Sequence, residues 1–223
     1  MINMNVTFED VKNNRDIKAY ISKADESLLA LGYTEHSFAH VHKVSELAGR
    51  ILQLLGYDDH QVELAKIACY LHDIGNIVNR VDHAQSGAVM AFRLLDRMNM
   101  SPEDIATVVT AIGNHDESTA FPVNPVAAAL IIADKTDVRR SRVRNRSQAY
   151  FDIHDRVNYS VTQSRLTISD DKKNITLRLA IDTEYGSVMD YFEIFLGRMI
   201  LCRKAAERLG LQFKLIINDQ PLI

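Results

Sequence analysis

The longest unbroken apolar segment of the chain, residues 126–133, most constrains what this sequence can fold into. It reads Val-Ala-Ala-Ala-Leu-Ile-Ile-Ala and follows Pro125, a residue that favours the first turn of a helix. A helix that is apolar on every side has to be buried on every side, so we expect a central core helix. Asp134 follows directly. Because burying an unpaired carboxylate is very costly, a metal cation or a Lys or Arg side chain must lie against it.

Apolar residues also recur every three or four positions in other segments, a spacing typical of amphipathic helices. Gly56 stands where a helix C-cap glycine is expected, and Asp82 is a candidate N-cap with Gln85 completing a capping box. The predicted helices are residues 8–31, 37–55, 59–74, one starting at Asp82, one starting at Ser101, and one from Pro125 to about Val138.

The pattern changes in the C-terminal third. Residues 161–169 and 174–182 alternate apolar with polar side chains around a polar turn, which predicts a β-hairpin. Residues 186–209 then have helical spacing, and residues 211–217 have the pattern of a last strand. The predicted fold is therefore mainly α: a helical domain over 1–145 with a small C-terminal α+β (ββαβ) domain over 146–223.

Three strands and one helix can hide one face of a sheet but leave its edges unpaired. A homodimer through the C-terminal domain would cover these edges, and we state it as a hypothesis. The role of this domain is otherwise open.

Composition excludes several classes of protein. A net charge of −3 argues against a basic nucleic-acid binder, and two cysteines are too few for a disulfide framework. We see no signal peptide and no apolar run of the ~20 residues that span a bilayer. We therefore expect a cytoplasmic protein with no membrane partner.

Histidine is the unusual component, with eight residues in a chain that has no tryptophan. Five of the eight, together with two aspartates, sit on apolar helix faces or at helix ends. Imidazole and carboxylate together suit Zn, Mn, Fe, Ni and Co ions. His72 and Asp73 lie ~100° apart on a helix, so both can reach one metal only near a helix end, which Gly75 supplies.

The order and flanks of these residues resemble the HD superfamily of metal-dependent phosphohydrolases. His40-Val-His-Lys-Val44 is similar to the first histidine helix of that family, and Leu71-His-Asp-Ile-Gly75 is close to its signature. Ala133-Asp-Lys135 resembles its closing motif. The extra histidines of its dinuclear branch are matched by His83, which precedes Gly87-Ala88, and by His115 within Ala111-Ile-Gly-Asn-His-Asp116. The resemblance covers about residues 30–140 and implies an HD-type helical bundle there.

The resemblance implies one or two divalent transition-metal ions, with Asp73 bridging. The first ion would be held by His40, His72, Asp73 and Asp134, and the second by Asp73, His83 and His115. It further implies hydrolysis of a phosphate ester or phosphoanhydride, in a nucleotide or another small phosphorylated substrate, by metal-activated water. Lys135 could donate to a phosphoryl oxygen, and Asp116 could carry a proton.

A basic segment follows the last proposed ligand. Five of the nine residues in 138–146 are arginines, whose guanidinium groups suit phosphate. Arg139 and Arg140 lie nearest to Asp134 and are our candidates for substrate binding. His36, one turn before His40, is a further candidate for the pocket. We interpret His42, His60 and His154 as surface residues.

Two motifs of known branches of the HD superfamily are missing, which argues against the functions of those branches. The chain lacks the Gly-Tyr-Pro motif of cyclic-dinucleotide phosphodiesterases, and Ile74-Gly75-Asn76-Ile77 replaces the Glu-Asp pair of the alarmone hydrolases. Two alternatives to hydrolysis stay open: a mixed-valent di-iron oxygenase of the same superfamily, and a non-enzymatic metal-stabilised sensor or scaffold.

Overall fold

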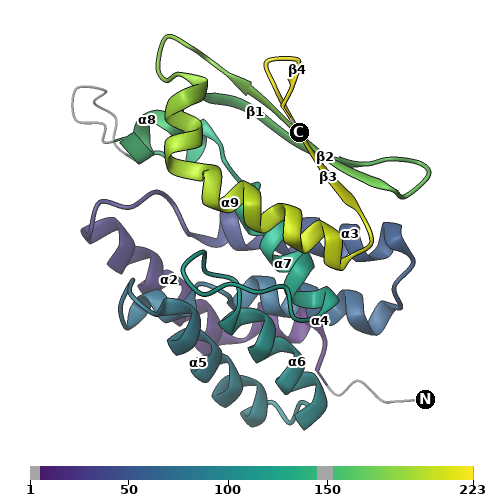
Figure 1. Ribbon diagram of the computed structural model, residues 1–223. Coiled ribbons are helices and arrows are strands. Elements are labelled where there is room, and N and C mark those ends of the chain that lie inside the picture. Colours follow the sequence, from purple (N-terminus) through teal and green to yellow (C-terminus); the bar gives the residue numbers. More distant parts are fainter. Residues whose placement is uncertain (1–5, 145–152, 223) are drawn as a thin grey trace.

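A computed structural model describes residues 6–144 and 153–222 and shows a helical body that carries a small sheet at one end (Figure 1). The helical body contains α1 (Phe8–Asn13), α2 (Arg15–Ala30), α3 (Phe38–Leu55), α4 (Asp59–Leu71), η1 (Ile74–Ile77), α5 (His83–Arg97), α6 (Pro102–Gly113), α7 (Pro125–Lys135) and η2 (Arg140–Arg142). The C-terminal part contains α8 (Ile153–Ser160), β1 (Val161–Ile168), β2 (Asn174–Ile181), α9 (Val188–Arg208), β3 (Gln212–Ile217) and β4 (Gln220–Pro221). The predicted fold class, a mainly α protein with an α+β appendage, is confirmed.

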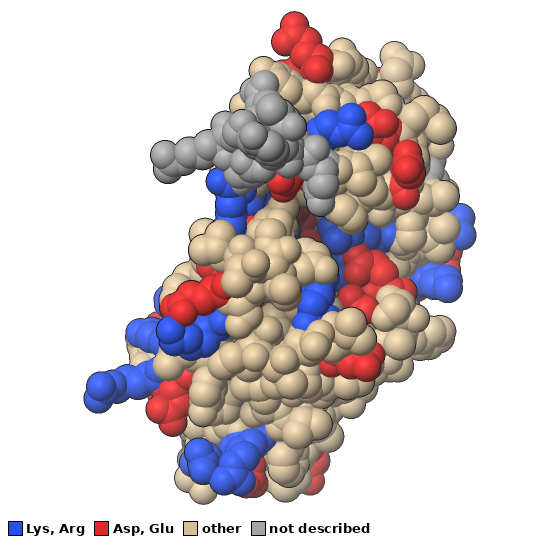
Figure 2. Space-filling view, turned by 90° about the vertical axis from the view of Figure 1, so that its left-hand side faces the viewer, with Lys and Arg blue, Asp and Glu red and all other residues tan. Residues whose placement is uncertain are grey.

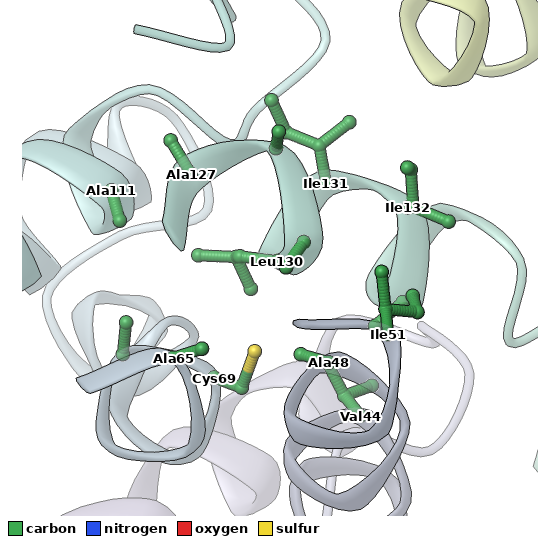
Figure 3. Packing of buried hydrophobic residues seen from close by; sticks show 14 of the residues in the cluster. Val44, Ala48, Ile51, Ala65, Cys69, Ala111, Ala127, Leu130, Ile131 and Ile132 are labelled. Atoms are coloured by element: carbon green, nitrogen blue, oxygen red, sulfur yellow. The ribbon is translucent and has the colours of Figure 1, made fainter. Parts of the chain in front are cut away.

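The apolar helix α7 is the centre of the core. Every residue of 126–133 is buried, as predicted. Leu130 points toward Ala65 and Cys69 of α4, and Ile132 lies near Ile51 of α3 (Figure 3). α7 also packs on α6 and α9. Since neighbours surround it, the last turn of α7 delivers Asp134 and Lys135 to the interior of the protein.

Most predicted helix ends are confirmed. Gly56 ends α3 in the left-handed region at φ 89°, and the Ser101 hydroxyl accepts a hydrogen bond from the Asp104 amide at the start of α6. The single helix predicted over 8–31 is wrong. Asn14 adopts an extended conformation (ψ 127°) and its side chain caps α2, so the segment splits into α1 and α2.

The capping box predicted at Asp82 and Gln85 is also wrong. Asp82 takes a left-handed backbone conformation (φ 56°), and its side chain makes no cap hydrogen bond. The Gln85 amide instead donates to the Gly113 carbonyl and to Thr119. This contact ties the start of α5 to the end of α6, where two of the candidate ligands lie.

The C-terminal sheet has the strand order β1-β2-β3-β4, with β1 antiparallel to β2, β2 parallel to β3 and β3 antiparallel to β4. The α9 helix connects the parallel strands and lies between the sheet and the helical body (Figure 1). Its buried face includes Tyr191, Phe195 and Met199. Because α9 contacts both β3 and α7, the appendage is packed directly on the core helix that carries Asp134.

None of the helices in the described part of the chain is both long and apolar enough to cross a membrane.

A close approach of backbones fixes the turn after α4. A Cβ atom placed on Gly75 would lie 2.0 Å from the His83 carbonyl oxygen and 2.5 Å from the Gly87 nitrogen. These are backbone atoms of α5, so a side chain at residue 75 has no room. Glycine here is what allows η1, which follows Asp73, to lie against the start of α5.

We therefore expect Gly75→Ala to lower the free energy of unfolding by about 1–3 kcal/mol, because α5 must move to relieve the overlap. Urea denaturation followed by circular dichroism measures this. Gly197→Ala is the matched control: a Cβ there meets nothing within 4 Å, and a mid-helix Gly→Ala change is neutral or stabilising by up to about 1 kcal/mol. Equal stability of the two variants would contradict the packing argument.

Candidate metal centre

Four of the predicted ligands meet where α3, α4 and α7 come together. His40 belongs to α3, His72 caps the end of α4, Asp73 follows it, and Asp134 lies in the last turn of α7. The Asp134 Oδ1 atom lies 3.3 Å from His40 Nε2 and 3.7 Å from His72 Nε2. The Asp73 Oδ2 atom lies 3.1 Å from His72 Nε2 and 3.7 Å from His40 Nε2. The tertiary structure thus brings residues from three distant segments into one cluster.

The other two predicted ligands form an adjoining cluster. His83 begins α5, and His115 follows the end of α6. Their Nε2 atoms are 3.2 Å apart, and His83 Nε2 lies 3.6 Å from Asp73 Oδ1. The two oxygens of Asp73 therefore face the two clusters, one each.

The four histidines of the two clusters share one orientation. In each ring Nδ1 lies 2.6–3.0 Å from an oxygen acceptor: the Asp137 carboxylate for His40, and the carbonyls of Cys69, Arg80 and Ile112 for His72, His83 and His115. Nδ1 therefore carries the proton in the neutral ring, and Nε2 presents its lone pair to the cluster. This is the tautomer that binds a metal through Nε2.

The donors fit a divalent transition-metal ion. The buried Nε2 atoms of His40 and His72 have no hydrogen-bond partner among the described residues. Two ligands that bind one ion at about 2.1 Å lie roughly 3–4 Å apart, which matches the separations of 3.1–3.7 Å given above. Ligand atoms of His40, His72 and Asp134 lie within 4.8 Å of one another, as do those of His72, Asp73 and His115.

The pKa values of the clustered side chains reflect the positive charge that the two carboxylates require nearby. Burial alone would raise the pKa values of the Asp73 and Asp134 carboxyls, yet cationic neighbours hold both well below their usual range. Burial would lower the pKa of His72, but the same two carboxylates raise it to about 10. Burial and the nearby charges of His72 and Lys135 lower the pKa of His115 to about 3. A proton on His72 thus takes the place that a metal ion would fill.

Sequence reasoning missed Asp137. Its carboxylate is buried, accepts the Nδ1 proton of His40 at 2.8 Å, and binds Lys43 and Arg139. The hydrogen bond from His40, the positive charge of Arg142 and the hydrogen bond from Lys43 lower its pKa despite its burial. The available signal was its position three residues after Asp134, about one helical turn further along.

Lys135 is buried beside the cluster. Its Nζ atom lies 2.8 Å from Asp134 Oδ2 and 3.2 Å from Glu117 Oε2. Glu117 also binds Arg198 of α9. Asp134 and Glu117 raise the pKa of Lys135 against the effect of burial, so the ammonium stays charged. A chain of ion pairs therefore links the proposed ligand Asp134 to the C-terminal appendage.

Asp116 lies at the edge of the second cluster. Its Oδ1 atom is 4.0 Å from His83 Nε2, and its other oxygen accepts a hydrogen bond from the Ser118 hydroxyl. This places it near the candidate metal donors without making it one of the closest groups.

A cavity of about 340 Å³ opens onto the clusters. On the surface it corresponds to a hollow lined by acidic and basic side chains (Figure 2). The cavity lining includes Asp73, Asp134, His83 and His115. The appendage supplies one wall through α8 and α9, including His154, Asn158, Phe195 and Arg198. The cavity is thus shared by the helical body and the appendage.

The structure does not bring Arg139 and Arg140 into this cavity. Arg139 binds Asp137 and Glu35. Arg140 binds Asp182 and the Tyr159 carbonyl and lies over the rings of Tyr159 and Tyr185. The arginines that line the cavity are Arg80, Arg142 and Arg198. Arg146 of the same basic segment lies outside the described residues.

The other histidines are divided. His36 lines the cavity, as predicted, and donates from Nδ1 to the Thr34 carbonyl at 2.7 Å. Burial holds its pKa well below the usual value, so it is neutral. His154 is exposed but also lines the cavity, whereas His42 and His60 are half-buried. Both side chains stay partly exposed, in line with the surface interpretation, and each also has a partner: His42 packs against Tyr70, and His60 pairs with Asp104.

The chain is similar to one protein family and to two individual proteins. Residues 37–139 match the family model of the HD domain. The uncharacterized protein MJ1020 of Methanocaldococcus jannaschii is 22% identical over 202 residues, which is 80% of this chain and 77% of that protein. A solved structure, that of a predicted HD superfamily hydrolase from an uncultured Thermotogales bacterium, is 28% identical with a TM-score of 0.44, covering 56% of this chain and 68% of the other.

We expect a divalent transition metal in excess to raise the Tm of the wild-type protein by about 5–10 °C, because it binds only the folded state. Asp73→Asn should lose most of this gain, since both clusters share the Asp73 carboxylate. Differential scanning fluorimetry with and without a chelator measures the shift. Asp96→Asn, at an exposed position of α5, should respond like the wild type. A full metal response in Asp73→Asn would contradict the assignment.

His72 predicts a pH dependence. Its pKa is about 10 in the folded metal-free protein against 6.5 when unfolded, so its contribution to stability is fully present below about pH 6.5. That contribution declines as the pH rises toward 10. Metal binding at pH 7.5 should therefore release the His72 proton. Calorimetric metal titrations in buffers of different ionisation enthalpy measure this release. His72→Gln should release fewer protons, and identical release by the variant would contradict the argument.

Proposed function

This chain is an HD-domain protein, and we propose that it hydrolyses a phosphate ester or phosphoanhydride bond in a small phosphorylated molecule. HD domains bind divalent metals, and the chain presents two groups of imidazole and carboxylate donors that could hold such ions. One observation carries the proposal. The shared carboxylate of Asp73 lies in the floor of a cavity whose other lining side chains include four basic residues, Arg80, Lys135, Arg142 and Arg198.

We propose that His40, His72, Asp73 and Asp134 hold one ion and that Asp73, His83 and His115 hold a second. The two oxygens of Asp73 face different clusters, which supports its bridging role. When bound, such a pair of ions supplies Lewis acidity and lowers the pKa of water. The protein itself contributes fixed Nε2 donors and a buried, preorganised charge environment.

Lys135 is the residue that we propose donates to a phosphoryl oxygen. It is charged, it lines the cavity, and it is 5% exposed, so little water competes for its protons. Phosphoryl transfer depends mainly on positioning and on neutralising charge, which a buried ammonium next to the ligand Asp134 can supply. Asp116 is the proposed proton carrier, because it lies beside His83 and keeps an ionised carboxylate.

The size of the cavity favours a small substrate. A volume of about 340 Å³ falls within the range typical of small-molecule sites. The wall formed by α8 and α9 adds contacts beyond the phosphoryl group, so we propose that the appendage helps to select the rest of the substrate. Arg142 and Arg198 are better placed for this role than Arg139 and Arg140, which lie outside the cavity lining.

The decisive experiment is a screen of the protein loaded with Mn, Fe, Zn, Ni or Co against chromogenic phosphate esters and nucleotides. We expect phosphate release by the wild type. Lys135→Met should lower kcat by about 10²–10³-fold while keeping its metal, because it removes one charge-neutralising donor. Lys204→Met, an exposed lysine of α9, should keep full activity.

Two outcomes would replace the proposal. The same donors suit a pair of iron ions, so a mixed-valent EPR signal after partial reduction, with dioxygen uptake and no phosphate release, would favour an oxygenase. Full metal content with no turnover of any phosphorylated compound or dioxygen would favour a metal-stabilised sensor or scaffold.

A further inference from the structure

The four basic residues that line the cavity differ in their partners. Lys135 binds Asp134 and Glu117, and Arg198 binds Glu117. Arg142 lies 3.8 Å from an oxygen of Asp137 and donates to two backbone carbonyls. Arg80 differs from these three, because no carboxylate of the described residues lies within 4.0 Å of its guanidinium group. Among the described residues that line the cavity, Arg80 is therefore the one basic side chain without a carboxylate in ion-pair distance.

The side chain of Arg80 reaches the second cluster, which contains His83 and His115. One terminal nitrogen lies 3.4 Å from His83 Nε2 and 3.2 Å from the Asn76 side-chain oxygen. The Asn76 amide in turn donates to Asp73 Oδ1 at 3.0 Å. Asn76 thus holds the guanidinium group on the same side of the site as the oxygen of Asp73 that faces the second cluster.

An aromatic ring also contacts this arginine. The guanidinium carbon of Arg80 lies 5.6 Å from the ring centroid of Tyr33, a distance typical of a cation–π contact. Tyr33 lies in the cavity lining, between α2 and α3. The contact restricts the direction of the side chain but uses few of its five N–H donors. Donors therefore remain for an anionic ligand.

The Arg80 side chain is not needed to orient His83. The backbone carbonyl of residue 80 accepts the Nδ1 proton of His83 at 3.0 Å, and any substitution at this position keeps that carbonyl. A change of the side chain therefore separates anion binding from the placement of the neighbouring metal donor.

We propose that Arg80, supported by Tyr33 and Asn76, binds an oxygen of the substrate's phosphoryl group at the metal centre. This inference rests on the proposed function and assigns the residue that recognises the anion. A guanidinium group donates to two oxygens of a phosphate group at once, and such charge-assisted bonds are among the strongest in proteins. No sequence pattern indicates this role, because Arg80 is an isolated arginine outside the basic segment 138–146.

The test is a calorimetric titration of the full-length, Mn-loaded protein with inorganic phosphate, with metal content measured in the same samples. Arg80→Ala should bind phosphate about 10–100-fold more weakly at unchanged metal content. Arg80→Lys should lie between this variant and the wild type, because it keeps the charge but loses the two-pronged geometry. Arg93→Ala, at an exposed position of α5, should bind like the wild type.

The outcomes separate this assignment from the proposed function. Unchanged phosphate affinity in Arg80→Ala would overturn the assignment, even if the wild type hydrolyses phosphate esters. Loss of metal from Arg80→Ala, with normal phosphate affinity at equal metal occupancy, would also overturn it and make Arg80 a positioning residue. Arg80-dependent phosphate binding by a wild type that hydrolyses nothing would support the assignment while the proposed hydrolysis fails.

Discussion

The structure depends on two carboxylates, the buried Asp73 and the mostly buried Asp134, that lie among largely apolar helices. Such groups are stable in the interior only when positive charge lies against them. In this protein His72, whose pKa rises to about 10, and Lys135 supply that positive charge. A divalent cation would neutralise the same two carboxylates. It would also give a partner to the Nε2 atoms of His40 and His72, which have no hydrogen-bond partner among the described residues.

The same demand connects the two parts of the chain. Lys135 shares Glu117 with Arg198, and Arg198 belongs to the helix that supports the C-terminal sheet. The appendage thus contributes charge near Asp134 as well as a wall of the cavity. This gives the ββαβ segment a role in the site that is independent of any contact between copies of the chain. The homodimer remains a separate hypothesis.

Prediction from sequence succeeded where the signal is local. The apolar run before Asp134 defines a core helix, and Gly56, Ser101 and Pro102 mark helix ends through their own backbone and side-chain preferences. It failed where a local pattern competes with a neighbour: Asn14 breaks a helix that periodicity alone continues, and Gln85 leaves its expected cap to bind Gly113. Nearness in sequence also misled, because Arg139 and Arg140 follow Asp134 yet bind Glu35 and Asp182.

The sequence by itself determined the helical class of the fold, the C-terminal strands and the six candidate metal ligands, because periodicity and the order of motifs are written along the chain. Only the tertiary structure decided which side chains share a space. It places the two oxygens of Asp73 toward different clusters and orients each clustered histidine through the hydrogen bond of its Nδ1 atom. It also leaves Arg80 with no carboxylate of the described residues within 4.0 Å of its guanidinium group. These features depend on distances between segments far apart in sequence, and no local preference encodes such distances.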